Sequence, residues 1–186
     1  MVADKAARKA RPHHPLILVL GGARSGKSRY AEARTRAFCA AATQAIYVAT
    51  AQAHDREMAR RIALHKKQRG KKRWRTLEAP IELAQTLAAQ TQPTLVDCLT
   101  LWLTNLMLAE RPIAAAAKEL CRTLAKRRAP IVLVANEVGL GIVPDNKMAR
   151  DFRDHAGRLH QAIGAIATDV VFVAAGLPLA LKGKSA

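Results

Sequence analysis

The feature that most constrains this sequence is the run Gly21-Gly22-Ala23-Arg24-Ser25-Gly26-Lys27-Ser28. It matches the pattern G-x-x-x-x-G-K-[ST] at every fixed position. A continuous apolar run, residues 16–20, precedes it and predicts a strand buried on both faces. An alanine-rich segment that predicts a helix follows it. In this setting the glycines let successive backbone N–H groups point at phosphate oxygens, and the helix adds its positive N-terminal end. The sequence therefore predicts a P-loop that binds a nucleoside triphosphate.

Two side chains of this run and one aspartate elsewhere predict the chemistry of the loop. Lys27 is expected to neutralise the β- and γ-phosphates, and the Ser28 hydroxyl to ligate Mg²⁺. A P-loop also needs a carboxylate on the magnesium side, at the end of a neighbouring strand. Asp97 follows a short apolar run and is the best candidate. An aspartate in such a place is otherwise often a helix cap, but beside a P-loop we favour the metal role.

The remainder of the chain alternates between apolar runs and helical segments. The further strands are expected at residues 45–49, 94–97, 131–135 and 170–173. The helices are expected at residues 27–42, 54–69, 80–91, 99–128 (as two helices) and 146–168. This alternation predicts an α/β domain with a mostly parallel sheet, whose ligands bind at the carboxyl ends of the strands. We expect one domain over residues 15–186, preceded by a disordered basic leader, residues 1–14.

Composition narrows the class of protein without choosing a partner. The formal net charge is +17, and a dense basic block lies between Lys66 and Arg75. Such charge permits nucleic acid, an anionic membrane surface or polyphosphate as a ligand, and a solvated basic face is the simplest alternative. The longest apolar stretch, residues 95–109, is too short to cross a bilayer. Three scattered cysteines argue against a disulfide framework and against a zinc cluster. We expect a cytoplasmic protein.

One histidine admits two interpretations. Met58, Ile62 and His65 are spaced four and three residues apart, so a helix places them on one face. His65 could be a packed histidine at the end of an apolar stripe. A neutral imidazole is also a competent nucleophile toward phosphorus, and the basic residues after His65 could stabilise a leaving pyrophosphate. The spacing leaves both interpretations open.

An ordered set of motifs resembles one known family. The set comprises GGARSGKS at 21–28, YVATAQ at 47–52, the DREM segment leading to His65, WRTLEAP at 74–80, the segment 97–105 and NEVGLGIVP at 136–144. Together they resemble the bifunctional adenosylcobinamide kinase/adenosylcobinamide-phosphate guanylyltransferase family of cobalamin biosynthesis. The resemblance runs from about Leu16 to Leu181. Only the P-loop is decisive alone, but the ordered set is specific.

The resemblance implies a RecA-like P-loop fold and two reactions. The first phosphorylates adenosylcobinamide with ATP or GTP, and the second transfers GMP from GTP to the resulting phosphate with release of pyrophosphate. It implies that His65 carries the GMP and that members assemble as homotrimers. The nucleotide contacts that it implies are Gly21, Gly22, Ala23, Arg24, Ser25, Gly26, Lys27, Ser28, Thr50, Ala51, Gln52, Lys66, Lys67, Gln68, Arg69, Glu78 and Asp97.

Two rival functions share parts of this pattern. A P-loop kinase of another small molecule would use the same loop and Asp97 but no covalent histidine. A nucleic-acid-binding ATPase of RecA type would suit the fold and the charge, and it would bind DNA or RNA with steep salt dependence. Trp74 is the only aromatic residue beside the basic block, which disfavours base stacking. We therefore expect no nucleic-acid partner, and the resemblance implies a nucleotide and a corrinoid as ligands.

Overall fold

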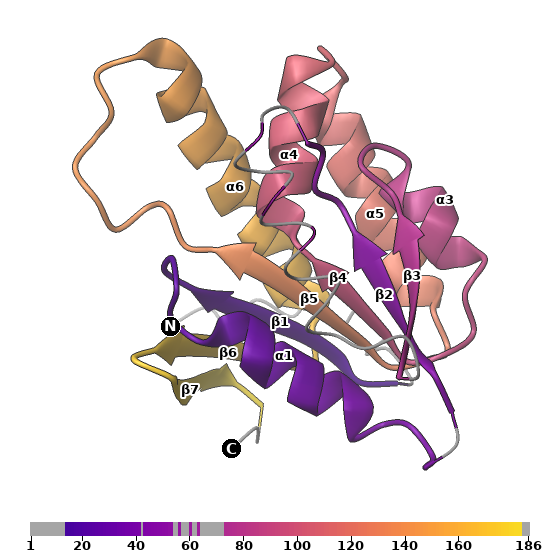
Figure 1. Cartoon of the computed structure of the whole chain (residues 1–186). Helices are drawn as coiled ribbons and strands as arrows, with labels where there is room; N and C mark the ends of the chain where they lie inside the picture. The colour runs from indigo at the N-terminus through magenta and orange to yellow at the C-terminus, as the bar shows by residue number, and fades with distance from the viewer. Residues whose placement is uncertain are drawn as a thin grey trace, which may run out of the picture.

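A twisted, mostly parallel sheet forms the centre of the molecule (Figure 1). The structure is a computed structural model that describes residues 14–41, 43–53, 56, 60, 63 and 73–183. The strands are β1 (Leu16–Gly21), β2 (Ala45–Ala49), β3 (Trp74–Glu78), β4 (Thr94–Asp97), β5 (Ile131–Asn136), β6 (Asp169–Ala174) and β7 (Leu177–Lys182). Their order is β3-β2-β4-β5-β1-β6-β7. Strands β1 to β6 are parallel, and β7 pairs antiparallel with β6.

Helices cover both faces of this sheet. They are α1 (Lys27–Arg36), α3 (Leu83–Ala88), α4 (Leu99–Leu108), α5 (Ile113–Lys126) and α6 (Lys147–Ile166). Helix α1 crosses one face, and α3, α4, α5 and α6 pack on the other (Figure 1). Strand β1 shows why the strands are continuous apolar runs. Its Leu16 and Leu18 enter the core under α3–α6, while Ile17 and Val19 enter the core under α1.

The fold confirms the predicted alternation and adds two strands to it. All five expected strands form, and the segment 99–128 is two helices, with Pro112 as the N-cap of the second. The added strands, β3 and β7, are the two edges of the sheet. Their side chains are largely exposed, so neither has the apolar run that marks the central strands. The expected helix 27–42 is shorter and ends at Arg36.

Several expectations concern residues outside the described part of the chain. They include the leader 1–14, apart from His14, and most of the helix expected over 54–69, of which residues 56, 60 and 63 are described and helical. The division into leader and domain stays a prediction. Among the described residues, no helix is both long and apolar enough to cross a membrane.

Candidate nucleotide-binding site

The P-loop joins β1 to α1 as a tight turn at the carboxyl edge of the sheet. The Ser25 amide donates to the Gly22 carbonyl over 3.3 Å, and the Tyr30 amide donates to the Gly26 carbonyl over 3.1 Å. Gly26 has φ +95°, and a Cβ there would lie 3.1 Å from the Cα of Gly176. This position therefore needs glycine both for its backbone angle and for its close approach to the β6–β7 turn. The Gly176 amide braces the loop by donating to the Ser25 carbonyl over 2.8 Å.

Lys27 is held against the loop that it follows. Its Nζ donates to the Gly22 carbonyl over 3.0 Å, and the residue is buried. Burial lowers the pKa of Lys27, and the nearby Cys98 and Asp97 oppose that shift. Cys98 is itself buried, and this burial raises the pKa of its thiol to about 11.

A buried hydroxyl in the loop supports a phosphate ligand. The Ser25 Oγ atom is buried and has no hydrogen-bond partner among the described residues. An unpaired buried hydroxyl is costly, and a phosphate oxygen would satisfy it.

Asp97 ends β4 and is held by a tyrosine from the neighbouring strand. Its Oδ2 accepts a hydrogen bond of 2.6 Å from the hydroxyl of Tyr47. Tyr47 is 3% exposed, and its ring meets that of Trp74 edge to face, with centroids 5.7 Å apart. One such bond leaves the carboxylate with further acceptor capacity. The aspartate is therefore fixed in orientation and can still bind a cation.

The donor set at this edge fits a magnesium ion. Ser28 is the second residue of α1, which follows β1, and Asp97 ends β4, so the hydroxyl and the carboxylate belong to segments that leave the two strands flanking β5. Among residues 14–41, 43–53 and 73–183, no three His, Cys, Asp or Glu side chains cluster as a metal site. Mg²⁺ is commonly bound through one or two carboxylates, with substrate phosphates and water completing its shell. A site with one carboxylate suits that chemistry.

The other described residues of the implied nucleotide site lie two or more strands from the P-loop strand. Ala49 pairs with Glu78 on one side and with Asp97 on the other, so Thr50, Glu78 and Asp97 lie together at the carboxyl edge. Thr50 is buried, Glu78 is exposed, and both Ala51 and Gln52 are partly exposed. The remaining implied residues, His65, Lys66, Lys67, Gln68 and Arg69, lie outside the described residues.

Two supporting residues have roles that sequence reasoning missed. Tyr47 orients Asp97, and Asn105 of α4 donates from Nδ2 to the carbonyls of Thr50 at 2.7 Å and Pro80 at 3.0 Å. The sequence does carry a signal for Asn105, because it is an amide in the middle of the apolar segment LTLWLTNLML. Tyr47 carries no comparable signal, since a tyrosine suits any buried strand.

Comparison with known proteins agrees with these features. The family model described as "Cobinamide kinase / cobinamide phosphate guanyltransferase" matches residues 17–181. The chain is 48% identical to the bifunctional adenosylcobalamin biosynthesis protein CobP of Pseudomonas aeruginosa, over 90% of this chain and 97% of that protein. It is 41% identical to the bifunctional adenosylcobalamin biosynthesis protein CobU of Salmonella typhimurium, over 90% of this chain and 99% of that protein. The resemblance inferred from the motifs is confirmed.

Comparison with solved structures concerns the fold alone. The flagellar accessory protein FlaH of Methanocaldococcus jannaschii superposes with a TM-score of 0.53 at 15% sequence identity. The match covers 97% of this chain and 84% of that one. The expected P-loop NTPase fold of RecA type, with a mostly parallel sheet, is confirmed.

Proposed function

The chain belongs to the cobinamide kinase/cobinamide phosphate guanyltransferase family, and we propose that it performs both reactions at the carboxyl edge of its sheet. It first phosphorylates the aminopropanol hydroxyl of adenosylcobinamide with ATP or GTP. It then transfers GMP from GTP to that phosphate through a GMP-histidine intermediate on His65. The products of the second reaction are adenosylcobinamide-GDP and pyrophosphate. Both reactions take place in the cytoplasm, which supplies the two nucleotides, and neither involves a nucleic acid.

In the kinase reaction the P-loop positions the donor. The substrate hydroxyl oxygen attacks the γ-phosphorus and loses its proton to water. The bond from that phosphorus to the β,γ-bridging oxygen breaks, and the nucleoside diphosphate leaves. Backbone N–H groups of residues 21–28 and the Lys27 ammonium neutralise the phosphate oxygens. Ser28 and Asp97 would hold Mg²⁺, which would supply further neutralisation of the phosphate charge. Tyr47 keeps the Asp97 carboxylate in one orientation for this role.

In the guanylyl transfer the nucleophile is separate from the P-loop. A ring nitrogen of His65 attacks the α-phosphorus of GTP. The bond from that phosphorus to the α,β-bridging oxygen breaks, and pyrophosphate leaves. The phosphate oxygen of adenosylcobinamide phosphate then attacks the same phosphorus, and the P–N bond breaks. We assign the nucleoside and pyrophosphate contacts to the residues beyond the P-loop, namely Thr50, Ala51, Gln52, Lys66, Lys67, Gln68, Arg69 and Glu78.

The observation that carries this proposal is the placement of Lys27. Its ammonium group is fixed on the Gly22 carbonyl and lies near the Asp97 carboxylate, at the edge where β2, β3 and β4 also end. One triphosphate can therefore be gripped by the loop and reach the residues that follow the other strands. This arrangement suits two reactions that share a donor.

The test uses GTP labelled at the α-phosphate. The wild-type protein should become labelled, and the label should be released by acid, as expected for a phosphoramidate. His65→Ala should abolish the labelling and retain kinase activity. Lys27→Ala should depress both activities, because both donors present the same triphosphate. Unchanged labelling of His65→Ala would refute the nucleophile, and a normal kinase rate in Lys27→Ala would refute the role of the loop.

We also propose that the chain assembles as a homotrimer, and its exposed apolar residues support self-association. The connection from β5 to α6 projects away from the sheet (Figure 1) and carries Leu140 and Ile142, which are 82% and 97% exposed. On β7, Leu177, Leu179 and Leu181 are also exposed. Large apolar side chains gathered on one projecting segment are typical of contact surfaces.

A further inference from the structure

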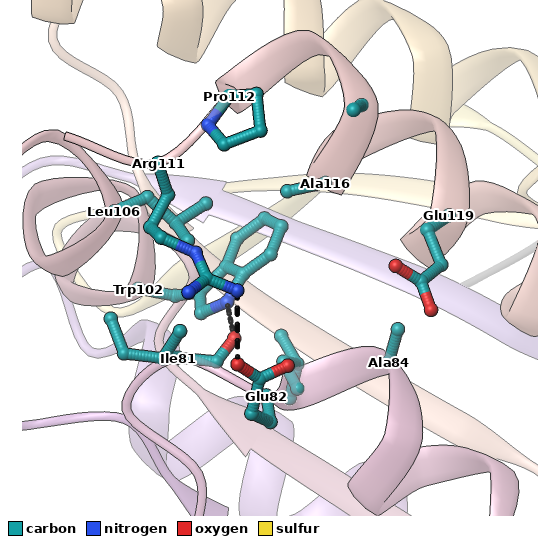
Figure 2. A pocket seen from close by; sticks show the side chains of 11 residues that line it. Ile81, Glu82, Ala84, Trp102, Leu106, Arg111, Pro112, Ala116 and Glu119 are labelled. Atoms are coloured by element: carbon teal, nitrogen blue, oxygen red, sulfur yellow. Dashed lines mark hydrogen bonds and ion pairs between the residues drawn. The ribbon is translucent and has the colours of Figure 1, made fainter. Parts of the chain in front are cut away.

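Helix α4 fixes the chain segments that leave two neighbouring strands. Its Asn105 donates to the carbonyl of Thr50, the residue after β2, and to the carbonyl of Pro80, two residues after β3. One turn earlier, Trp102 Nε1 donates to the Ile81 carbonyl over 2.8 Å. Figure 2 shows this bond beside the ion pair that joins Arg111, just beyond α4, to Glu82 at 3.2 Å. Three consecutive residues, 80–82, are thus held from α4 or just after it.

The side-chain amide of Asn105 is buried, and it donates to these two carbonyls rather than to water. The residue is 4% exposed, and both hydrogen bonds come from the same Nδ2 atom. Burying an amide in an apolar helix costs free energy unless its donors are bonded. Here both N–H groups donate to main-chain carbonyls of residues that follow β2 and β3. Asn105 therefore joins the ends of β2 and β3 to α4.

The end of β4 belongs to the same unit. The Thr50 hydroxyl donates to the Cys98 carbonyl over 2.7 Å and accepts from the Cys98 amide over 2.9 Å. The Ala79 amide donates to the Ala49 carbonyl over 2.9 Å, which extends the β2–β3 pairing by one residue. The ends of β2, β3 and β4 are consequently one hydrogen-bonded unit anchored on α4. We call it the α4-anchored edge.

The part of the α4-anchored edge that Asn105 bonds, after β2 and β3, is well separated from the P-loop, whereas the β4 end carries Asp97 beside Lys27. In the sheet, β2 lies three strands from β1, which corresponds to about 14 Å at ordinary strand spacing. The P-loop has its own supports, namely the Gly176 amide and the Lys27–Gly22 bond. A triphosphate held in the P-loop can therefore reach the residues after β2 and β3 only with its nucleoside end. Asp97 is held separately by the Tyr47 hydroxyl and by the pairing of β4 with β2 and β5. A disturbance of Asn105 should therefore reach the nucleoside end and leave the phosphate grip unchanged.

We propose that Asn105 is a positioning residue for nucleoside recognition, which acts by fixing the residues that follow β2 and β3 in the places where they meet the nucleoside. This role rests on the proposed function, because it assumes that GTP phosphates bind in the P-loop. Asn105 does not itself touch the nucleotide. Through these residues, Asn105 determines how much more tightly the protein binds GTP than the polyphosphate alone.

The experiment compares two ligands, GTP and inorganic tripolyphosphate, by calorimetric titration in Mg²⁺ and physiological salt. In Asn105→Leu, the Kd of GTP should rise about tenfold or more, as expected for a misplaced binding surface. The Kd of tripolyphosphate should change by less than about twofold, as expected for a distant, independent site. The matched control is Thr104→Val on the same helix, which removes only a bond of 3.1 Å to the Thr100 carbonyl. It should change neither Kd.

A general loss of structure would lower the affinity for both ligands together. The ratio of the two Kd values therefore separates a positioning role from a loss of stability. An equal rise in both Kd values in Asn105→Leu, or an unchanged Kd of GTP, would overturn the proposal. Hydrogen exchange on the wild-type protein gives a reading that needs no variant. GTP should protect the amides of residues 49–53, 79, 81 and 82 more than tripolyphosphate does, and equal protection would overturn the proposal as well.

The proposed function fails on different results. If Lys27→Ala leaves tripolyphosphate affinity unchanged, the P-loop is not the phosphate site, whatever Asn105 does. If His65→Ala retains the GMP label, the covalent mechanism is wrong, and the affinity ratio still tests Asn105.

Discussion

Replacing Arg127 by methionine should cost this protein a large part of its stability. Arg127 is 8% exposed and follows α5. Its guanidinium donates to four acceptors, which are the carbonyls of Leu87 (2.8 Å), Gln90 (2.9 Å) and Gln92 (2.7 Å) and the hydroxyl of Thr94 (2.6 Å). It thereby joins the end of α3 to the start of β4. Methionine has a similar unbranched stem but no donor, so it removes all four bonds. The Leu87 carbonyl keeps the Gln90 amide and the Gln92 carbonyl keeps the Thr94 hydroxyl as partners.

The magnitude follows from two opposing quantities. A hydrogen bond from a charged donor contributes about 1.5–3 kcal/mol, so four contribute about 6–12 kcal/mol. Burial lowers the pKa of Arg127 to about 10, from 12.5, which corresponds to a penalty of about 3 kcal/mol on the charged form. Water reaching some carbonyls in the variant reduces the difference further. We expect a net loss of about 3–5 kcal/mol.

Urea denaturation followed by circular dichroism measures this loss directly. For a chain of this length, 3–5 kcal/mol lowers the melting temperature by about 6–20 °C. The neighbouring Arg128 is exposed, so Arg128→Met is the matched control, and its free energy of unfolding should stay within about 0.5 kcal/mol of the wild type. A loss below about 1 kcal/mol in Arg127→Met would refute the reasoning, because it would mean that the four bonds only balance the cost of burying the cation.

Two further predictions concern the site and the assembly. Tyr47→Phe keeps the ring against Trp74 but removes the bond to Asp97, so the Mg²⁺ concentration needed for half-maximal kinase activity should rise while the melting temperature falls by only a few degrees. An unchanged Mg²⁺ requirement, measured by metal titration of the kinase rate, would show that the tyrosine does not orient a metal ligand. Ile142→Asp places a charge on the most exposed apolar side chain of the β5–α6 connection, and sedimentation should show a smaller species than the wild type forms. The same mass for both proteins would place the subunit contact elsewhere.

The sequence predicts the centre of the sheet better than its edges. Strand β1 and strand β5 are apolar runs because they are buried on both faces, and such runs stand out in the sequence. Strand β3 reads WRTLE and β7 reads LPLALK, with most side chains exposed, so polar residues and a proline obscure both. Their strand identity comes from pairing with β2 and β6, which is information that no local window contains.

The site divides in the same way. The P-loop is local, so eight consecutive residues predict its turn, its lysine and its glycines. Asp97 could be predicted because it ends an apolar run. Its tyrosine partner is 50 residues away, and the carbonyls that Asn105 holds are 55 and 25 residues away. These contacts depend on strand order, which the alternation of strands and helices leaves open.

The order of strands also has a consequence for synthesis of the chain on the ribosome. Strand β1 is made first, yet both of its neighbours, β5 and β6, come from the later half of the sequence. At about 5–20 residues per second, the interval from Gly21 to Ile131 takes about 5–20 s. During that time the apolar segment LILVLG has neither partner strand in place. The brace from Gly176 arrives later still, so the phosphate loop is completed only after β6 has also been synthesised.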